Sequence, residues 1–310
     1  MKKISIVTAC YNEAENVEIL INRVQKVMGE LKRKYEFEHI FIDNASTDKT
    51  VDILKKIAKK NPAIKIIVNS RNFGHIRSPF YGLLQGDGDA VISLVADLQD
   101  PPELILDFVQ MWERGYRIVV GVKTSSKEHP ILYWLRNVYY RFITRLSDIE
   151  MVQQFTGFGL YDQKIIKILR SINDPYPYFR GLISDIGFEI AKISYQQPKR
   201  KHGHTKNNFY TLFDMGLTGI TNHTKIPLRF AIIFGFLGSV VSVIIGLLYF
   251  FYKLFYWHQI PVGVAPLVIG VFFIGSVQLF FLGIVGEYVG AIYTYSQNRP
   301  LVIEKERINF

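Results

Sequence analysis

The fold is decided by the stretch Ile4-Ser5-Ile6-Val7-Thr8-Ala9-Cys10-Tyr11-Asn12-Glu13 near the start of the chain. Residues 4–9 are rich in β-branched and apolar side chains, and polar residues follow them at once, which predicts a strand that ends near residue 9. An amphipathic stretch from about residue 14 to residue 34 then predicts a helix. A short apolar strand that leads into such a helix is typical of an α/β domain.

The same alternation continues outward from this stretch to residue 122. Strands are predicted at 37–43, 64–68, 90–95 and 118–122, and helices at 49–60, 76–85 and 102–114. Strands that alternate with helices at this spacing predict an α/β fold with a mostly parallel, Rossmann-like sheet that helices cover on both faces.

Polar side chains follow four of the predicted strands. Ligands of such sheets bind beyond the carboxyl ends of the strands, so these side chains predict one site at a single edge. Each alone also suits a turn or a helix cap, and Asn44 and Asp48 are good capping residues. The segments are Tyr11-Asn12-Glu13, Asp43-Asn44-Ala45-Ser46-Thr47-Asp48, Ser70-Arg71-Asn72-Phe73-Gly74-His75 and Asp97-Leu98-Gln99-Asp100-Pro101-Pro102.

Two long uncharged stretches set the last third of the chain apart. They cover residues 230–252 and 259–286, and a helix of either length spans the roughly 30 Å hydrocarbon layer of a bilayer. The alternative is a buried hairpin of a soluble protein, whose helices are rarely apolar for so long. We therefore expect an α/β domain over 1–226, a transmembrane hairpin over 227–290 with spans near 230–252 and 262–286, and a cytoplasmic tail over 291–310.

Charge and cysteine content bear on the compartment. The chain has a net charge of +10 and one cysteine, Cys10, so an intrachain disulfide is excluded and a reducing compartment is expected. Basic residues precede the first span, whereas the loop between the spans holds only Lys253, which predicts that both termini face the cytoplasm. Nucleic-acid binding suits the charge but explains neither the spans nor the acidic residues that follow the strands.

The strand-end motifs resemble those of family 2 glycosyltransferases with the GT-A fold. The likeness is to the polyprenyl-phosphate glycosyltransferases, which include GtrB-type bactoprenol glucosyltransferases and dolichol-phosphate mannose synthase. It extends from the first strand to the two-span tail and includes Ala96-Asp97-Leu98-Gln99-Asp100-Pro101-Pro102-Glu103 and Gly203-His204-Thr205-Lys206. The resemblance implies an inverting transfer of a sugar from a nucleotide-sugar, expected to be a UDP-sugar, to a polyprenyl phosphate such as undecaprenyl or dolichyl phosphate.

The resemblance also implies roles for individual residues. Asp97 and Gln99 are expected to ligate Mg²⁺ or Mn²⁺ beside the diphosphate, and hard oxygen ligands suit such a cation. Arg200, with Lys206, is expected to meet the lipid phosphate, with Arg136 as a further candidate; the competing interpretation of residues 199–206 is a solvated or lipid-attracting charge run. The expected catalytic residues are thus Asp97, Arg200 and Lys206, and the expected nucleotide site comprises Ala9, Tyr11, Glu13, Asp43, Asn44, Arg71, Asn72 and Asp97.

The sequence departs from the family pattern at three places. Val95 replaces the first carboxylate of Asp-Ala-Asp, Asn44 replaces the second of an Asp-Asp pair, and Gly157-Phe158-Gly159-Leu160 lies where relatives carry Gly-Asp-Phe-Arg. The alternative function is therefore a catalytically silent scaffold that binds nucleotide or lipid. A processive polysaccharide synthase is disfavoured, because its Gln-x-x-Arg-Trp motif is missing. Partners expected from the resemblance are the nucleotide-sugar, the polyprenyl phosphate and the inner-membrane bilayer, with a homotetramer carried by the resemblance alone.

Overall fold

A computed structural model of the chain describes residues 1–124, 152, 154–172, 174–198, 226–255 and 264–310. The chain divides into two compact units. Met1–Met215 and Asn298–Phe310 form the first, and Gly216–Gln297 form the second. The candidate site lies in the first unit.

The predicted alternation of strands and helices is confirmed through residue 123. The elements are β1 (Lys2–Cys10), α1 (Val17–Leu31), β2 (Tyr35–Asp43), α2 (Thr50–Ala58), β3 (Ile64–Asn69), α3 (Gly74–Leu84), β4 (Ala90–Val95), η1 (Pro102–Leu104), α4 (Ile105–Glu113) and β5 (Ile118–Lys123). Beyond them lie β6 (Phe155–Asp162), α6 (Gln163–Ser171), α7 (Phe179–Asp185) and β7 (Ile190–Tyr195), which the sequence analysis did not assign.

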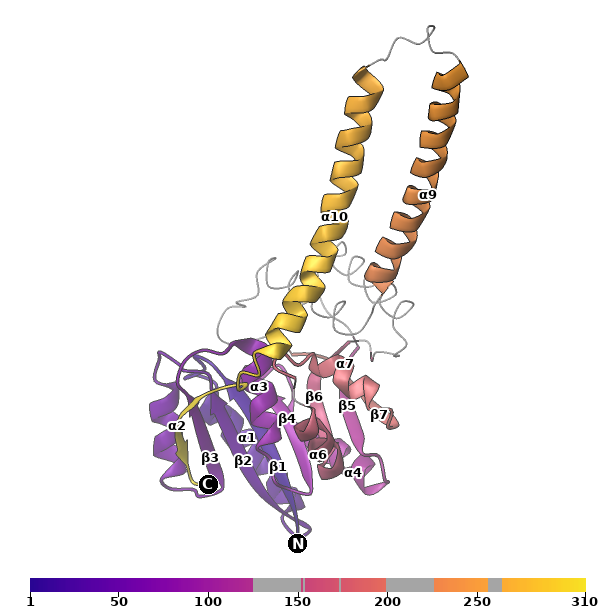
Figure 1. Ribbon diagram of the computed structural model, residues 1–310. Coiled ribbons are helices and arrows are strands. Elements are labelled where there is room, and N and C mark those ends of the chain that lie inside the picture. Colours follow the sequence, from indigo (N-terminus) through magenta and orange to yellow (C-terminus); the bar gives the residue numbers. More distant parts are fainter. Residues whose placement is uncertain (125–151, 153, 173, 199–225, 256–263) are drawn as a thin grey trace. The chain divides into compact units, whose positions relative to one another are not determined.

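The described residues form an eight-stranded sheet in the order β7-β5-β6-β4-β1-β2-β3-β8, where β8 is Glu304–Ile308 (Figure 1). Strand β1 lies at its centre and pairs in parallel with β4 on one side and β2 on the other. Strand β6 runs antiparallel to β4 and β5, and β8 runs antiparallel to β3. The sheet is therefore mostly parallel, as predicted.

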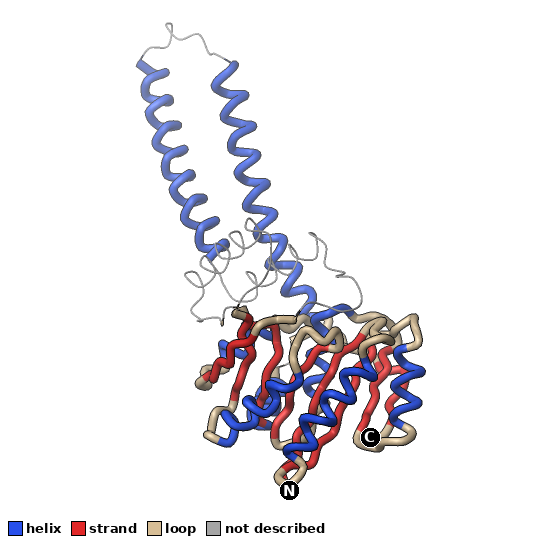
Figure 2. Tube along the Cα trace, turned by 180° about the vertical axis from the view of Figure 1, so that it is seen from behind, coloured by secondary structure: helices blue, strands red, loops and turns tan. Residues whose placement is uncertain are grey.

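Apolar side chains of the strands alternate between two cores, one on each face of the sheet. In β1, Ile4 and Ile6 belong to the core that α1, α2 and α4 cover, whereas Val7 belongs to the core that α3, α6 and α7 cover. Figure 2, a view from behind, shows the helices on the face opposite to the one that Figure 1 presents. Helices on both faces leave the ends of the strands as the exposed part of the sheet.

The last residues of the chain return to the sheet. Strand β8 adds to the edge of β3, and Ser70 N donates to Ile303 O (2.9 Å) where the loop after β3 begins. Residues 291–310 are expected from the sequence to form a cytoplasmic tail, and no strand is predicted there. The observed strand β8 carries the alternating charges of Glu304-Lys305-Glu306-Arg307. An edge strand tolerates such charges, since they help to prevent pairing with other chains.

The second unit contains two long helices, α9 (Ile226–Phe255) and α10 (Val264–Ser296), which include most of the two predicted spans. Within the described residues, one segment, Phe273–Ser296 of α10, is long and apolar enough to cross a membrane, and none of its most apolar window is buried in the protein. The structure thus gives two helices and one candidate span.

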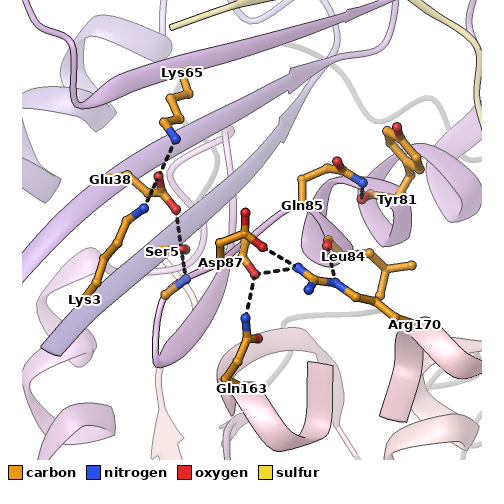
Figure 3. Close-up of polar contacts among 12 residues, drawn as sticks. Lys3, Ser5, Glu38, Lys65, Tyr81, Leu84, Gln85, Asp87, Gln163 and Arg170 are labelled. Atoms are coloured by element: carbon orange, nitrogen blue, oxygen red, sulfur yellow. Dashed lines mark hydrogen bonds and ion pairs between the residues drawn. The ribbon is translucent and has the colours of Figure 1, made fainter. Parts of the chain in front are cut away.

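The amino ends of the central strands are joined by a buried carboxylate, Glu38 of β2 (Figure 3). Its Oε2 lies 2.6 Å from Lys3 Nζ of β1 and 2.8 Å from Lys65 Nζ of β3, and its Oε1 accepts a hydrogen bond from Ser5 (2.6 Å). Burial favours a higher pKa for Glu38, but these contacts outweigh burial and hold the pKa below its ordinary value of 4.5. The ion pairs therefore stabilise three neighbouring strands at the edge opposite the candidate site.

Arg170 of α6 fixes the turn that precedes β4 (Figure 3). Its Nε donates to Leu84 O at the end of α3 (2.8 Å), and its Nη2 donates to Gly86 O (2.9 Å) and to Asp87 Oδ1 (2.9 Å). A guanidinium at this position satisfies carbonyl groups that the end of a helix leaves without partners.

We expect Glu38→Gln to lower the free energy of unfolding by about 2 kcal/mol near neutral pH, because two lysines lose a buried partner. Since the folded-state pKa of Glu38 lies below 4.5, its contribution is complete above that pH and is lost as the pH falls through the folded-state pKa. Urea unfolding of the chain in mild detergent, as a function of pH, measures this difference. Glu36→Gln, an exposed position on the same strand, is the matched control; equal losses in both variants would contradict the assignment.

Candidate active site

Three loops begin side by side at the carboxyl ends of β4, β1 and β2. In the register of the sheet, Ala9 lies beside Val95 of β4 and Cys10 lies beside Asp43 of β2. The loops that carry Tyr11, Asp43 and Asp97 therefore start from neighbouring positions. The sheet brings these predicted residues together, although they are far apart in the sequence.

Hydrogen bonds join the loop after β1 to the loop after β2. Asn12 N donates to Ser46 Oγ (2.9 Å), Thr47 N donates to Asn12 Oδ1 (2.8 Å), and Glu13 N donates to Thr50 Oγ1 (2.9 Å). The buried Glu13 side chain accepts a hydrogen bond from Asn16 Nδ2 (2.6 Å) at the start of the following helix. Glu13, a predicted nucleotide contact, is thus held in place by its own helix.

Asp43 ends β2 and is fully buried. Burial raises its pKa, although its carboxylate accepts hydrogen bonds from both the backbone N–H and the hydroxyl of Ser46. Burial, reinforced by the charge of Asp43, also raises the pKa of the Cys10 thiol, which keeps this cysteine protonated and unreactive. A buried carboxylate with both oxygens in a protein network suits a role in which it orients the loop after β2.

Asn44 organises the loop after β3. Its Oδ1 accepts from Asn69 Nδ2 (3.1 Å) and Phe73 N (2.9 Å), and its Nδ2 donates to Asn72 Oδ1 (2.9 Å) and Gly74 O (3.0 Å). An asparagine side chain has two donor hydrogens and two acceptor lone pairs, so these four bonds use its full capacity. Any contact between Asn44 and a nucleotide would have to displace one of them.

Each of the three loops holds a residue in the left-handed region of backbone conformation. These residues are Asn12 (φ 56°), Ala45 (φ 61°) and Leu98 (φ 61°). Such conformations cost alanine and leucine roughly 1–2 kcal/mol each. Non-glycine residues in this region cluster at functional sites, where the surrounding bonds hold them in place.

Asp97 and Gln99 flank Leu98 on the loop after β4. Leu98 is buried, whereas Asp97 and Gln99 are each half-buried, and Gln99 N donates to Asp97 Oδ1 (3.1 Å). In the part of the chain that is described, no three His, Cys, Asp or Glu residues are grouped as a metal site. One carboxylate with one amide oxygen fits a Mg²⁺- or Mn²⁺-type cation that takes its other ligands from substrate phosphates and water, not a dedicated protein cage.

Asp100 and Tyr195 form a pair that joins the loop after β4 to the end of β7. The Tyr195 hydroxyl donates to Asp100 Oδ1 (2.7 Å), and burial raises the pKa of Asp100 to about 6. The sequence places Asp100 among the strand-end polar residues, but it does not predict the pair, because Tyr195 lies 95 positions away. The one sequence feature that could have drawn attention to Tyr195 is the basic stretch 199–206, which follows it closely.

Strand β6 carries the segment Gly157-Phe158-Gly159-Leu160. Its amino end lies at the same edge as the carboxyl end of β5, since Phe155 pairs with Val122, and residues 155–157 have no ionisable side chain. Asp162 lies at the opposite edge, where it binds Trp112 Nε1 (2.9 Å) and Arg117 Nη1 (3.2 Å). Strand β6 therefore supplies no carboxylate to the candidate site.

The remaining predicted residues are placed as follows. Ala9 and Tyr11 are half-buried, and Arg71 and Asn72 are exposed on the loop after β3. Arg136, Arg200 and Lys206 lie outside the described residues.

Comparisons with known proteins relate most of the chain to glycosyltransferases. The model of the family described as glycosyl transferase family 2 matches residues 5–170. The chain is 33% identical over 300 residues to a Bacillus subtilis protein named "Uncharacterized glycosyltransferase YkcC". The match covers 96% of this chain and 92% of the relative. It is 29% identical to the "Bactoprenol glucosyl transferase" of Shigella phage SfV, with 98% of both chains covered.

A solved structure supports the fold alone. The crystal structure of a mycobacterial protein is 16% identical to this chain, with a TM-score of 0.50, and the match covers 71% of this chain and 73% of the other.

We expect Asn44→Asp to disrupt the loop after β3, because an oxygen would replace the donor that faces Asn72 Oδ1 and Gly74 O. The predicted loss of stability is about 3 kcal/mol, accompanied by at least tenfold weaker binding of a nucleoside diphosphate. Thermal unfolding and calorimetric titration with UDP measure the two effects.

Asn61→Asp is the matched control, because within the described residues the Asn61 side chain bonds only through its oxygen, as acceptor from Ala63 N (3.0 Å), and aspartate retains that bond. Wild-type stability and UDP affinity in Asn44→Asp would show that the loop does not depend on the Asn44 network.

Proposed function

Because the chain belongs to glycosyl transferase family 2, we propose that it transfers a sugar from a nucleotide-sugar to a polyprenyl phosphate, with inversion at the anomeric carbon. The product is a polyprenyl-phosphoryl sugar, and the leaving group is a nucleoside diphosphate. The likeness to a bactoprenol glucosyl transferase over 98% of the chain supports a lipid acceptor, because it includes the helices as well as the α/β domain.

The observation that carries the proposal is the convergence of three loops with acidic and amide groups at the carboxyl edge of β4, β1 and β2. In α/β sheets this edge is where ligands bind. We assign the base and ribose of the donor to Tyr11, Glu13 and Asp43. Ala9, Arg71 and Asn72 line the same edge, and Asn44 holds the loop that carries Arg71 and Asn72.

Asp97 and Gln99 would hold the divalent cation beside the diphosphate. When bound, a cation of this type stabilises the negative charge that develops on the departing nucleoside diphosphate. The half-buried position of both side chains, next to the buried Leu98, supports this role because it keeps their oxygens fixed and still accessible. A UDP-sugar is the donor we favour.

The acceptor requires little help with deprotonation. A phosphate monoester has a second pKa of about 6, so it is largely dianionic at neutral pH, and a site without a carboxylate on β6 suffices. We assign the acceptor phosphate to Arg200 and Lys206, which follow β7. In this proposal α9 and α10 form a transmembrane hairpin, and the catalytic domain faces the cytoplasm beside the lipid.

The test is transfer of radiolabelled sugar from UDP- and GDP-sugars to undecaprenyl phosphate in detergent, with Mg²⁺, with Mn²⁺ or with EDTA. We expect labelled lipid that requires a metal and that falls at least 100-fold in Asp97→Ala, about 2.7 kcal/mol of transition-state stabilisation. Asp107→Ala, an exposed aspartate on α4, is the matched control and should retain activity.

Binding of UDP without transfer from any donor would contradict the proposal and favour a silent scaffold. Equal activity of Asp97→Ala and Asp107→Ala would contradict the assignment of Asp97.

We further expect Val95→Asp to strengthen metal binding. Val95 ends β4 beside Ala9 and is 40% exposed. A carboxylate there adds a second anionic oxygen ligand, so the Mn²⁺ concentration for half-maximal UDP binding should fall about tenfold. Val95→Asn controls for the change of shape, and an unchanged Mn²⁺ requirement in Val95→Asp would show that this position does not face the cation.

A further inference from the structure

Three arginines that have no acidic partner among the described residues gather where α3 begins. Arg71 lies on the loop after β3, Arg77 lies in the first turn of α3, and Arg299 precedes β8. The guanidinium carbon of Arg71 lies 4.1 Å from the centre of the Phe73 ring, and that of Arg77 lies 5.7 Å from it. We name Arg71, Arg77 and Arg299 the arginine cluster.

The positive charges of the three arginines repel one another unless an anion lies between them. Burial lowers the pKa of Arg77, and the positive charges of Arg71 and Arg299 lower it further. Arg77 Nη2 donates to Pro300 O, but its Nε is buried and has no hydrogen-bond partner among the described residues. The eleven-residue helix α3 also directs the positive end of its dipole toward this corner. Like charges, an unsatisfied donor and a helix N-terminus together indicate that an anion is the missing partner.

The chemistry of the cluster favours a phosphate. Guanidinium groups match phosphate oxygens through paired N–H donors. Arg71 Nη1 donates to Asn72 O (3.2 Å), and stacking on Phe73 leaves the other in-plane N–H groups of Arg71 available for such contacts. Arg71 and Arg299 are exposed, so a ligand can reach them from solvent or from a membrane surface.

The covalent chain places Arg299 close to the end of α10. Only residues 297 and 298 separate it from Ser296, so even a fully extended chain keeps it within roughly 10 Å of that helix end. The candidate membrane segment Phe273–Ser296 ends at the same residue. A phosphate near this point belongs most naturally to a lipid, because basic groups beside a membrane helix bind anionic headgroups.

We propose that the arginine cluster binds the phosphate group of a membrane lipid. The inference rests on the membrane placement of α10 in the proposed function, but not on sugar transfer. The phosphate comes either from the polyprenyl phosphate acceptor or from a phospholipid headgroup that seats the catalytic domain on the bilayer. Both lipids present the same charged oxygens to the cluster.

The test is calorimetric titration of the full chain in neutral detergent with phosphatidylglycerol, with a short-chain polyprenyl phosphate, with diacylglycerol and with UDP. Arg299→Gln is the principal variant, because its side chain is exposed and outside any ion pair of the described chain. Arg77→Gln is the second variant. Arg33→Gln, an exposed arginine after α1 at the opposite edge of the sheet, is the matched control.

We expect at least tenfold weaker binding of a phosphate-bearing lipid in Arg299→Gln and Arg77→Gln, with wild-type affinity in Arg33→Gln and no effect with diacylglycerol. Weaker binding of polyprenyl phosphate alone identifies an acceptor site, and weaker binding of both lipids identifies a headgroup site. Wild-type affinity of both variants for both lipids overturns the proposal, and so does weaker UDP binding with unchanged lipid binding. A chain that binds lipids through the cluster but transfers no sugar would refute the proposed function and leave this inference intact.

Discussion

The parallel pairing of β1 with both β2 and β4 is the constraint on which the rest of the structure depends. Parallel neighbours end at the same edge, so the loops that carry Glu13, Asp43 and Asp97 must start side by side. Helices on both faces bury the strands and leave this edge exposed. The order of these three strands is therefore enough to bring carboxylates, amides and a cation close to one diphosphate.

Contacts that stabilise the sheet lie at its amino edge, and the loops proposed to bind ligands lie at its carboxyl edge. At the amino edge, Glu38 joins three strands through Lys3 and Lys65, and Arg170 fixes the turn before β4. At the carboxyl edge, Asn12, Ala45 and Leu98 adopt left-handed backbone conformations that are costly by themselves. Hydrogen bonds such as those of Asp43 to Ser46 hold these loops in shape. Three of the six non-glycine residues that adopt this conformation in the described part of the chain thus lie at the edge where ligands are proposed to bind.

The sequence predicted the elements with clear periodicity and missed those without it. The first five strands and the helices among them were predicted, because apolar runs alternate with amphipathic stretches. In β6, Gly157 and Gly159 weaken the strand signal, and Gly159 is required because a Cβ there would lie 2.4 Å from Val119 O. In β8, alternating charges hide a strand whose partner, β3, is more than 200 residues away. Strand-end carboxylates were predictable from local sequence, whereas the Asp100–Tyr195 pair and the saturated bonds of Asn44 arise only in the folded chain.

The most direct test of the account is a structure of the full chain with UDP and Mn²⁺, in which anomalous scattering locates the manganese. We expect the metal beside Asp97 and Gln99, with the diphosphate above the ends of β4 and β1 and the uridine next to Tyr11 and Asp43. Manganese and nucleotide at any other place, or nucleotide bound with no metal at Asp97, would contradict the claim that the carboxyl edge of the sheet is the donor site.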